Sequence, residues 1–181
     1  MDSSTQQINT EYDMDDTTNT THIFSEQLSK YRPVFLTYSE DADFVTLTHR
    51  LDQLPERKTI NLLLPRYAKL IAMKHEVDKA IAQSKTQTDY RFSKHLGGRV
   101  YVSVCSKYPC VDIRQFYLRD GDLKPLRQGV ALHYAEWYFF KLAYTKICGA
   151  IPSLAEMQHC SAAHDIENLD EAYACKECFP Y

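Results

Sequence analysis

The feature that most limits how this chain can fold is an internal repeat with an offset of about 70 residues. The segment Phe-Ser-Glu-Gln-Leu at 24–28 returns as Phe-Ser-Lys-His-Leu at 92–96, an offset of 68. The pattern Pro-x-Arg-x-x-(Ile/Val)-x-Leu occurs at 55–62 and again at 125–132, an offset of 70. Two matches in the same order and at nearly the same offset predict one supersecondary unit that is present twice.

The segments between these matches predict β-hairpins in both copies. Residues 34–38 and 44–48 alternate in polarity and are rich in Val, Phe, Thr and Tyr, as are residues 100–104 and 111–118 in the second copy. Such alternation is typical of strands that are buried on one face. Turn signals lie between the strands, at Ser39-Glu40-Asp41, at Ser106 to Pro109 and at Asp120-Gly121-Asp122.

Each copy ends in a segment with helical spacing of apolar residues. We expect helices near 65–82 and 134–147, and Trp137, Phe140 and Tyr144 lie 70 residues beyond Tyr67, Leu70 and Lys74, so both stripes have the same phase. A stripe of this spacing suits helices that pack along each other, and it equally suits a helix that covers its own sheet. The stripes are formed by Leu63, Tyr67, Leu70, Lys74, Val77 and Ile81, and by Trp137, Phe140, Tyr144 and Ile147.

Each unit therefore has the form β-β-β-β-α, in which a curved antiparallel sheet is followed by a helix. A unit of about 60 residues buries little surface alone, so two units paired through their helices are expected to form one body. The predicted fold is α+β, an intrachain pseudo-dimer. The expected divisions are a disordered acidic tail at 1–21, a divergent first repeat at 22–84, a second repeat at 90–148 and an acidic extension at 149–181.

The charge distribution favours a polyanionic ligand. Residues 1–21 carry five acids and no base, residues 149–181 carry six acids and one base, and residues 22–148 hold 13 acids against 20 bases, a net charge of +7. A basic body between acidic ends is typical of nucleic-acid binders, although it also serves solubility alone. No apolar run approaches the roughly 20 residues of a membrane helix, and the first residues do not resemble a secretory signal.

The six cysteines predict free thiols in a reducing compartment and no disulfide framework. Cys175 and Cys178 have the spacing of half a zinc site, but a second well-spaced pair is missing. No cofactor is therefore expected, and zinc is only a minor alternative, with Cys160, His164, Cys175 and Cys178 as its ligands. No phosphate-binding loop or catalytic motif has diagnostic spacing, so we do not expect an enzyme.

The second copy resembles a known family. The runs Arg-Val-Tyr-Val-Ser-Val at 99–104, Val-Asp-Ile-Arg-Gln-Phe-Tyr at 111–117, Asp-Gly-Asp-Leu-Lys-Pro-Leu-Arg-Gln-Gly-Val-Ala-Leu at 120–132 and Ala-Glu-Trp at 135–137 follow, in order, the pattern of the positive cofactor four family of transcriptional coactivators. The resemblance implies a dimer of curved sheets that binds single-stranded or melted DNA, in contact with RNA polymerase or general transcription proteins. It also implies the nucleus.

The resemblance implies a set of DNA-binding residues. Cations neutralise phosphates, and flat side chains stack on unpaired bases. Thr48 departs from the family pattern, where an arginine stands, and Cys105 occupies a position that is basic there, so binding is expected to be asymmetric. The expected residues are Arg99, Tyr108, Arg114, Tyr117, Lys124 and Arg127, joined from the first copy by Arg57 and Lys58.

Two functions follow from the sequence. The first is a single-stranded DNA-binding protein of coactivator type, acting in transcription or in replication and repair. The alternative is an interaction scaffold that keeps the fold without strong nucleic-acid binding. The two differ in whether Arg99, Arg114, Lys124, Arg127 and Tyr117 share one exposed face.

Overall fold

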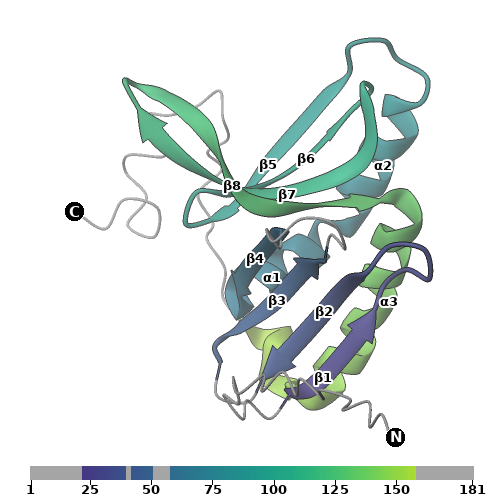
Figure 1. The fold of residues 1–181 in the computed structure, drawn as a ribbon, viewed down its shortest axis with the longest axis vertical. Helices are drawn as coiled ribbons and strands as arrows, with labels where there is room; N and C mark the ends of the chain where they lie inside the picture. The colour runs from purple at the N-terminus through teal and green to yellow at the C-terminus, as the bar shows by residue number, and fades with distance from the viewer. Residues whose placement is uncertain (1–21, 40–41, 51–57, 158–181) are drawn as a thin grey trace, which may run out of the picture.

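The computed structural model describes residues 22–39, 42–50 and 58–157. The predicted acidic tail at 1–21 and the end of the chain from residue 158 lie outside this range. The described residues form two four-stranded antiparallel sheets and a set of helices (Figure 1). The predicted α+β class is therefore confirmed.

The first sheet has its strands in chain order, each antiparallel to the next. The alternation of side chains accounts for this sheet, because one face is buried and the side chains on the other face are mostly polar. Val34, Leu36, Val45 and Leu47 are on the buried face. The strands are β1 His22–Gln27, β2 Val34–Ser39, β3 Phe44–His49 and β4 Lys58–Leu63.

The second sheet repeats the same order with longer final strands. The last hairpin turns at Asp120 and Gly121, which both have positive φ, as a two-residue turn between antiparallel strands requires. The preceding hairpin turns at Ser106 and Lys107, so Tyr108 belongs to a strand and not to the predicted turn. The strands are β5 Arg91–Gly97, β6 Val100–Cys105, β7 Tyr108–Arg119 and β8 Asp122–His133.

Each sheet is followed by helical structure, which differs from the sequence prediction in one respect. The single helix expected near 65–82 is two helices, α1 Leu64–Ala72 and α2 Lys74–Ser84, divided at Met73. Because the helix is divided, α1 packs against β3 and β4, whereas α2 packs against β6 and β7 of the other sheet. Leu63, predicted in the helical stripe, instead ends β4 and is exposed. The second sheet is followed by α3 Tyr134–Ala150 and a short 3-10 helix, η1 Pro152–Glu156.

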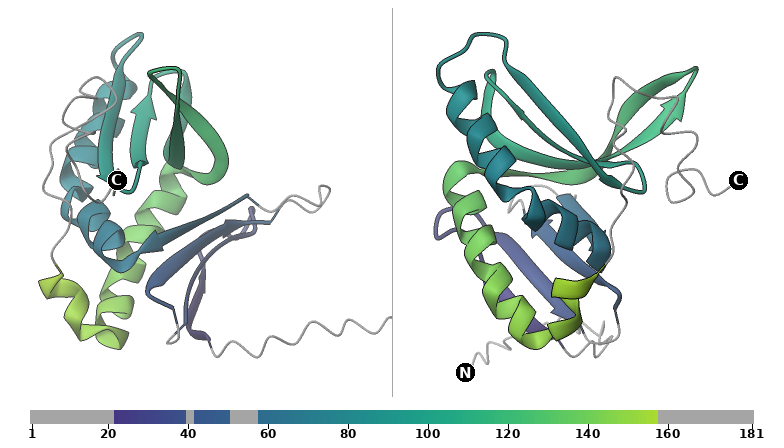
Figure 2. Two further views of the ribbon diagram at one scale, coloured as in Figure 1. Left: turned by 90° about the vertical axis from the view of Figure 1, so that its left-hand side faces the viewer. Right: turned by 180° about the vertical axis from the view of Figure 1, so that it is seen from behind.

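The helices lie together behind the two sheets (Figure 2), where α1 and α3 each contact both sheets and α2 contacts the second. Helix α3 follows β8, yet it also contacts β1 and β2 of the first sheet, while α1 and α2 reach β5, β6 and β7 of the second. Tyr67 of α1 is fully buried, and its ring centroid lies 5.5 Å from that of Phe140 and 5.9 Å from that of Tyr144 in α3. Apolar residues of both sheets and all three helices form one buried cluster.

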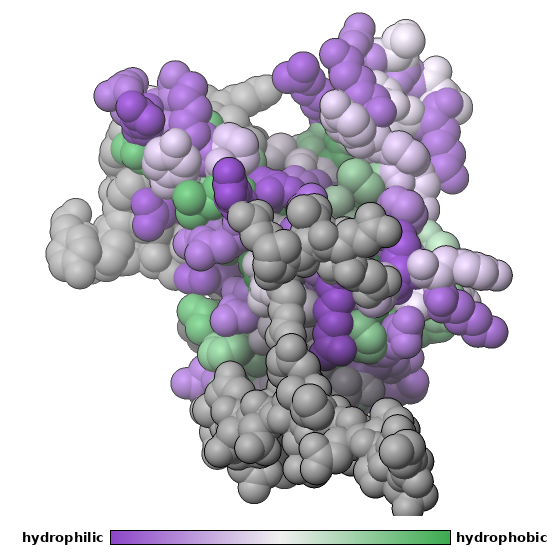
Figure 3. Space-filling model, in the orientation of Figure 1, coloured by the Kyte–Doolittle hydropathy of each residue, from purple (hydrophilic) through white to green (hydrophobic). Residues whose placement is uncertain are grey.

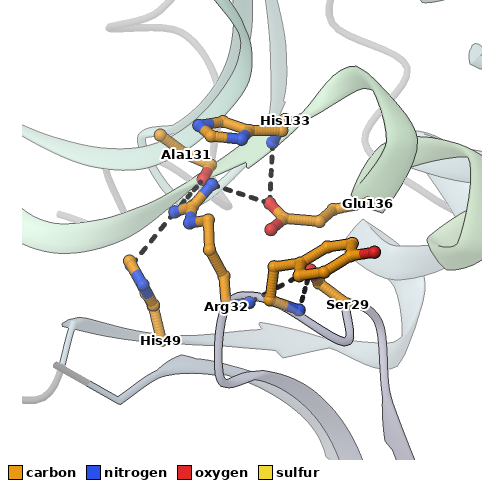
Figure 4. A network of polar contacts seen from close by, with 7 residues as sticks. Ser29, Arg32, His49, Ala131, His133 and Glu136 are labelled. Carbon is orange, nitrogen blue, oxygen red and sulfur yellow. Dashed lines mark hydrogen bonds and ion pairs between the residues drawn. The ribbon is translucent and has the colours of Figure 1, made fainter. Parts of the chain in front are cut away.

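A polar network also joins the two halves of the chain at the start of α3 (Figure 4). Arg32, between β1 and β2, donates to Glu136 Oε2 at 2.9 Å and to the carbonyl of Ala131 at 3.4 Å. The Arg32 guanidinium also contacts His49 Nδ1 at 3.2 Å. Glu136 is 2% exposed and also accepts the backbone N–H of His133, which closes a capping box. This ion pair therefore fixes the first sheet against the first turn of α3.

Candidate nucleic-acid interface

The end of the β7–β8 hairpin projects from the body as an arm, which we define as residues 116–127 (Figure 1). Arg119, Lys124 and Arg127 are exposed on it, and hydrophilic side chains gather at its tip (Figure 3). Arg119 pairs with Asp120 at 3.5 Å and Lys124 with Asp122 at 3.0 Å. Exposed pairs of this kind contribute under about 1 kcal/mol, so a phosphate can compete for these cations.

Arg114 occupies a different environment, at the base of the arm. Its guanidinium donates to both carboxylate oxygens of Asp112 at 2.9 Å and to the carbonyl of Leu126 at 3.0 Å. The hydrogen bonds to the Asp112 carboxylate raise the pKa of Arg114 above its ordinary value. The Leu126 carbonyl is available because β8 bulges here, with residues 126–128 between the pairs that Arg114 and Phe116 make across the sheet. Arg114 is therefore half-buried and holds the base of the arm together.

The alternation of strand side chains decides which predicted residues share a face. Arg114 lies on the face of Tyr101 and Phe116, whose ring centroids are 5.1 Å apart. Tyr117 is three residues beyond Arg114 and pairs across the hairpin with Lys124. The arm therefore presents Tyr117 and Lys124 on one side and Phe116 on the other. The five residues whose common face was expected to distinguish DNA binding from a scaffold do not all share one, and only those on the arm remain together as a candidate binding set.

The remaining predicted residues lie at the two ends of the second sheet and in the first half. Arg99 is in the β5–β6 turn with φ of 61°, and its carbonyl accepts the N–H of Phe116 at 2.8 Å, which ties this turn to the arm. Tyr108 starts β7 and is 67% exposed. Lys58 is exposed at the start of β4 opposite His49. Arg57 lies outside the described residues.

Two exposed cations that sequence reasoning did not select lie near Tyr108. They are Arg91, the first residue of β5, and Lys107 in the β6–β7 turn. Only the pairing between strands brings Arg91 and Tyr108 together. Cys105 of β6 pairs with Arg91 on one side and with Tyr108 on the other. Register of this kind cannot be read from local periodicity when a bulge intervenes.

The thiols of the second sheet are free among the described residues. Cys105 and Cys110 are half-buried on the strands that flank the β6–β7 turn. Burial, and then the nearby Asp112 and Cys105, raise the pKa of the Cys110 thiol above its ordinary value, so it stays protonated at neutral pH. Within ranges 22–39, 42–50 and 58–157 no cluster of three or more metal-ligating side chains occurs. The four cysteine and histidine residues named for zinc lie outside those ranges.

One family of known proteins has a model that matches part of the chain. Residues 98–143, from the β5–β6 turn through the arm and into α3, match the model of the family described as Transcriptional Coactivator p15 (PC4). The match includes Arg99, the whole arm and the start of α3, and lies wholly within the second half of the chain. No curated protein matches the chain. None of the helices in the described part of the chain has the length and apolar character needed to cross a bilayer.

Proposed function

We propose that this chain is a single-stranded DNA-binding protein of the transcriptional-coactivator type and not an enzyme. The observation that carries the proposal is the arm: three exposed cations and Tyr117 project from the segment that matches the coactivator family. Single-stranded nucleic acid is bound by cations that follow the phosphates and by rings that stack on bases. In a duplex the bases are already stacked, so Tyr117 has no free base to contact.

The two halves of the chain are proposed to be two copies of one unit that form a pseudo-dimer. Support comes from the equal strand order of the two sheets and from α1 and α3, each of which packs on its own sheet and on the other. Contacts of Tyr67 with Phe140 and Tyr144 join the helices directly. In this arrangement one chain supplies both units of the dimer that a coactivator otherwise forms from two chains, and only the second half carries the arm.

The cellular role follows from the family. The proposed site of action is melted DNA in the nucleus, in contact with RNA polymerase or general transcription proteins, or single strands exposed in replication and repair. Lys58 and Arg57 of the first half would extend the basic surface. Arg114 would act mainly by holding the arm, because its guanidinium donates to the Leu126 carbonyl at the arm's base, where the backbone carbonyl of Arg99 also accepts the N–H of Phe116.

An interaction scaffold is the second candidate, and α3 favours it. Tyr138, Phe139 and Leu142 are exposed on the outer side of this helix by 55%, 46% and 49%. Adjacent exposed apolar side chains of this size are typical of protein contact surfaces. In this reading the fold presents α3 to a partner and the arm is incidental.

Fluorescence anisotropy of a labelled oligonucleotide of about 20 nucleotides, single-stranded or duplex, tests the proposal. We expect tighter binding of the single strand and a log–log salt slope of about −2, from about −0.7 for each of three phosphates. Tyr117→Ala should weaken binding by about 1–3 kcal/mol without changing the slope. Tyr138→Ala, an exposed aromatic on α3, is the matched control and should bind normally. Equal affinity for duplex and single strand, or normal binding by Tyr117→Ala, would favour the scaffold.

A further inference from the structure

Two cysteines of the second sheet, Cys105 and Cys110, are neighbours across the β6–β7 turn. The regular pairing of these strands ends at Val104 and Val111, and each cysteine is the next residue from that pair toward the turn. Both valines are buried, so the cysteines beside them project from the opposite, outer face of the sheet. The structure therefore brings two free, half-buried thiols together from adjacent strands.

A bulge loosens the ladder between the strands at this point. Cys105 pairs with Tyr108, so Pro109 and Cys110 are the extra residues of the bulge. Proline has no N–H, so the interruption leaves no donor unpaired at residue 109. The Cα atoms of opposite residues in an antiparallel pair are about 4.5–5.5 Å apart, and a disulfide spans about 4.4–6.8 Å. The backbone therefore needs little movement for the two sulfur atoms to bond.

The two thiols differ in how a small oxidant reaches them. Cys105 lines an open hollow of about 330 Å³ together with Ser103 and Ser106. Cys110 lies on the next strand, where burial first, and then the nearby Asp112 and Cys105, raise the pKa of its thiol. Because the thiolate is the nucleophile in thiol chemistry, Cys110 is the less reactive of the two. Cys105 is thus placed to react first and Cys110 to complete the bond.

We propose that Cys105 and Cys110 are a dithiol modification site that a hydroperoxide oxidises to a cross-strand disulfide. The Cys105 thiolate attacks one oxygen of hydrogen peroxide, so that an S–O bond forms, the O–O bond breaks, and the hydroxide released takes up the thiol proton and leaves as water. The Cys110 thiol then loses its proton and attacks the Cys105 sulfur. An S–S bond forms, the S–O bond breaks, and the hydroxide released takes up that proton as a second water. Two thiols lose two electrons, and the peroxide gains them.

The site does not depend on the proposed DNA binding. Cys110 is six residues before the start of the arm at Phe116, about 20 Å along an extended strand. The disulfide closes the β6–β7 turn and leaves the arm hairpin as it is. A cellular dithiol or glutathione reverses the bond by thiol exchange, which agrees with two thiols that are free in the structure.

The first sheet has no cysteine at the equivalent positions. There the pair Tyr38 and Val45 is followed toward the turn by Ser39 and Phe44. The proposed oxidation therefore distinguishes the second half of the chain from the first.

Trypsin separates the two cysteines, which gives a direct test on the whole chain. Cleavage after Arg99, Lys107 and Arg114 yields one peptide with Cys105 and another with Cys110. After treatment with hydrogen peroxide and alkylation of the remaining thiols, mass spectrometry should find the two peptides joined, and dithiothreitol should separate them. Cys148→Ser, which removes a half-buried thiol of α3, is the matched control and should leave the joined species unchanged.

Single substitutions test the order of the two steps. In Cys110→Ser the sulfenic acid on Cys105 loses its partner, so dimedone should trap it. In Cys105→Ser the remaining Cys110 thiol should be trapped about tenfold less. Thermal unfolding verifies that both variants are folded.

Three results would overturn the proposal. The first is separate recovery of the two peptides from folded, peroxide-treated protein. The second is their joining to other peptides of the chain instead of to each other. The third is a joined species found only in covalent dimers on a non-reducing gel, because the bond would then lie between chains. Binding of single-stranded DNA, present or absent, changes none of these results, so the proposed function is tested separately.

Discussion

The outer faces of the two sheets differ at three equivalent positions. In the second sheet Asp112, Arg114 and Gly129 form a set: Arg114 pairs across the strands with Gly129 and is held by Asp112. In the first sheet Thr46, Thr48 and Thr59 stand at the same positions, and Thr48 pairs with Thr59.

This comparison shows that an arginine on such a face depends on its neighbours. A Cβ on Gly129 would lie 2.9 Å from Arg114 Cγ and 2.9 Å from the Ile113 carbonyl oxygen, closer than side chains normally approach. Glycine therefore leaves the space that the arginine crosses, and Asp112 fixes its direction. Where the arginine is absent, a threonine pair fills the space, with Thr59 Oγ1 at 3.4 Å from Thr48 Oγ1. The arginine of the second sheet is thus accompanied by a carboxylate that orients it and a glycine that leaves it space.

The junctions between the halves show a similar contrast. Glu136 and Arg66 are each the third residue of a helix, in α3 and α1 respectively, and each lies against the β-turn of the other half. Glu136 meets Arg32, whereas Arg66 lies over Gly98, where a Cβ would be 1.9 Å from its Nη2. One junction is thus a buried ion pair, and at the other a glycine with positive φ allows the arginine to lie close to the backbone.

The largest expected effect is on the buried junction. Arg32→Ala leaves the Glu136 carboxylate almost fully buried, with only the His133 N–H on Oε2 and no partner on Oε1 among the described residues. We expect a loss of about 3 kcal/mol in the free energy of unfolding, measured by urea denaturation. Lys146→Ala, which breaks the exposed pair with Glu26, should cost under about 1 kcal/mol.

A double variant separates loss of the pair from loss of the arginine alone. Arg32→Met with Glu136→Gln removes both charges and keeps a side chain that can complete the capping box. Most of the stability should return, because no buried charge is left without a partner. A double variant as unstable as Arg32→Ala would mean that packing of the Arg32 stem, and not the ion pair, joins the halves.

The next effect tests whether the space beside Gly129 can accommodate a side chain. Gly129→Ala should destabilise the protein by about 1–3 kcal/mol, because the new methyl group meets backbone and cannot be accommodated by a side-chain movement alone. Gly149→Ala is the control: nothing lies within 4 Å of its Cβ position in α3, so helix propensity should stabilise it by up to about 1 kcal/mol. Equal denaturation midpoints for the two variants would remove the steric explanation.

Transplanting the set into the first sheet is a sharper test with a smaller effect. Thr48→Arg alone should be destabilising, since Thr59 occupies the space and no carboxylate faces the new guanidinium. Adding Thr46→Asp and Thr59→Gly should recover about 1 kcal/mol beyond the sum of the separate changes, as coupled neighbours do. Denaturation of the single, double and triple variants measures this coupling. Purely additive changes would show that the three positions act independently.

The sequence predicted the α+β class and the strands, because the alternation of strand residues is a local signal. It did not predict the division at Met73, since neither proline nor glycine marks it and its cause is the packing of α2 on the other sheet. The arm itself was visible as a long hairpin with a turn at Asp120 and Gly121. The residues that bind on it stay predictions.

The environment of Arg114 was less accessible from the sequence. Its position in the family pattern suggested a phosphate contact. Asp112 stands two residues earlier and therefore on the same face of the strand, so an ion pair with Arg114 could have been predicted from the sequence. The roles of Gly129 and the Leu126 carbonyl depend on the β8 bulge, which sets register across the hairpin. The position of Tyr108 opposite Cys105 was not predicted for the same reason, because it depends on a bulge after Val104.

The smallest expected effect is a pH dependence of the buried junction. Burial first, then the charge of Arg32, lower the pKa of His49 below 6.5, with Lys58 and His133 adding to the lowering and Glu136 opposing it. Arginine only donates, so His49 Nδ1 accepts from Arg32 when the ring is neutral. Because the unfolded chain binds the proton more readily, stability should fall as the pH decreases from about 6.5 through the lowered pKa. His49→Gln retains an acceptor and does not titrate, so its free energy of unfolding should decline less over the same range. Denaturation at a series of pH values measures both proteins, and parallel curves would show that His49 does not contribute.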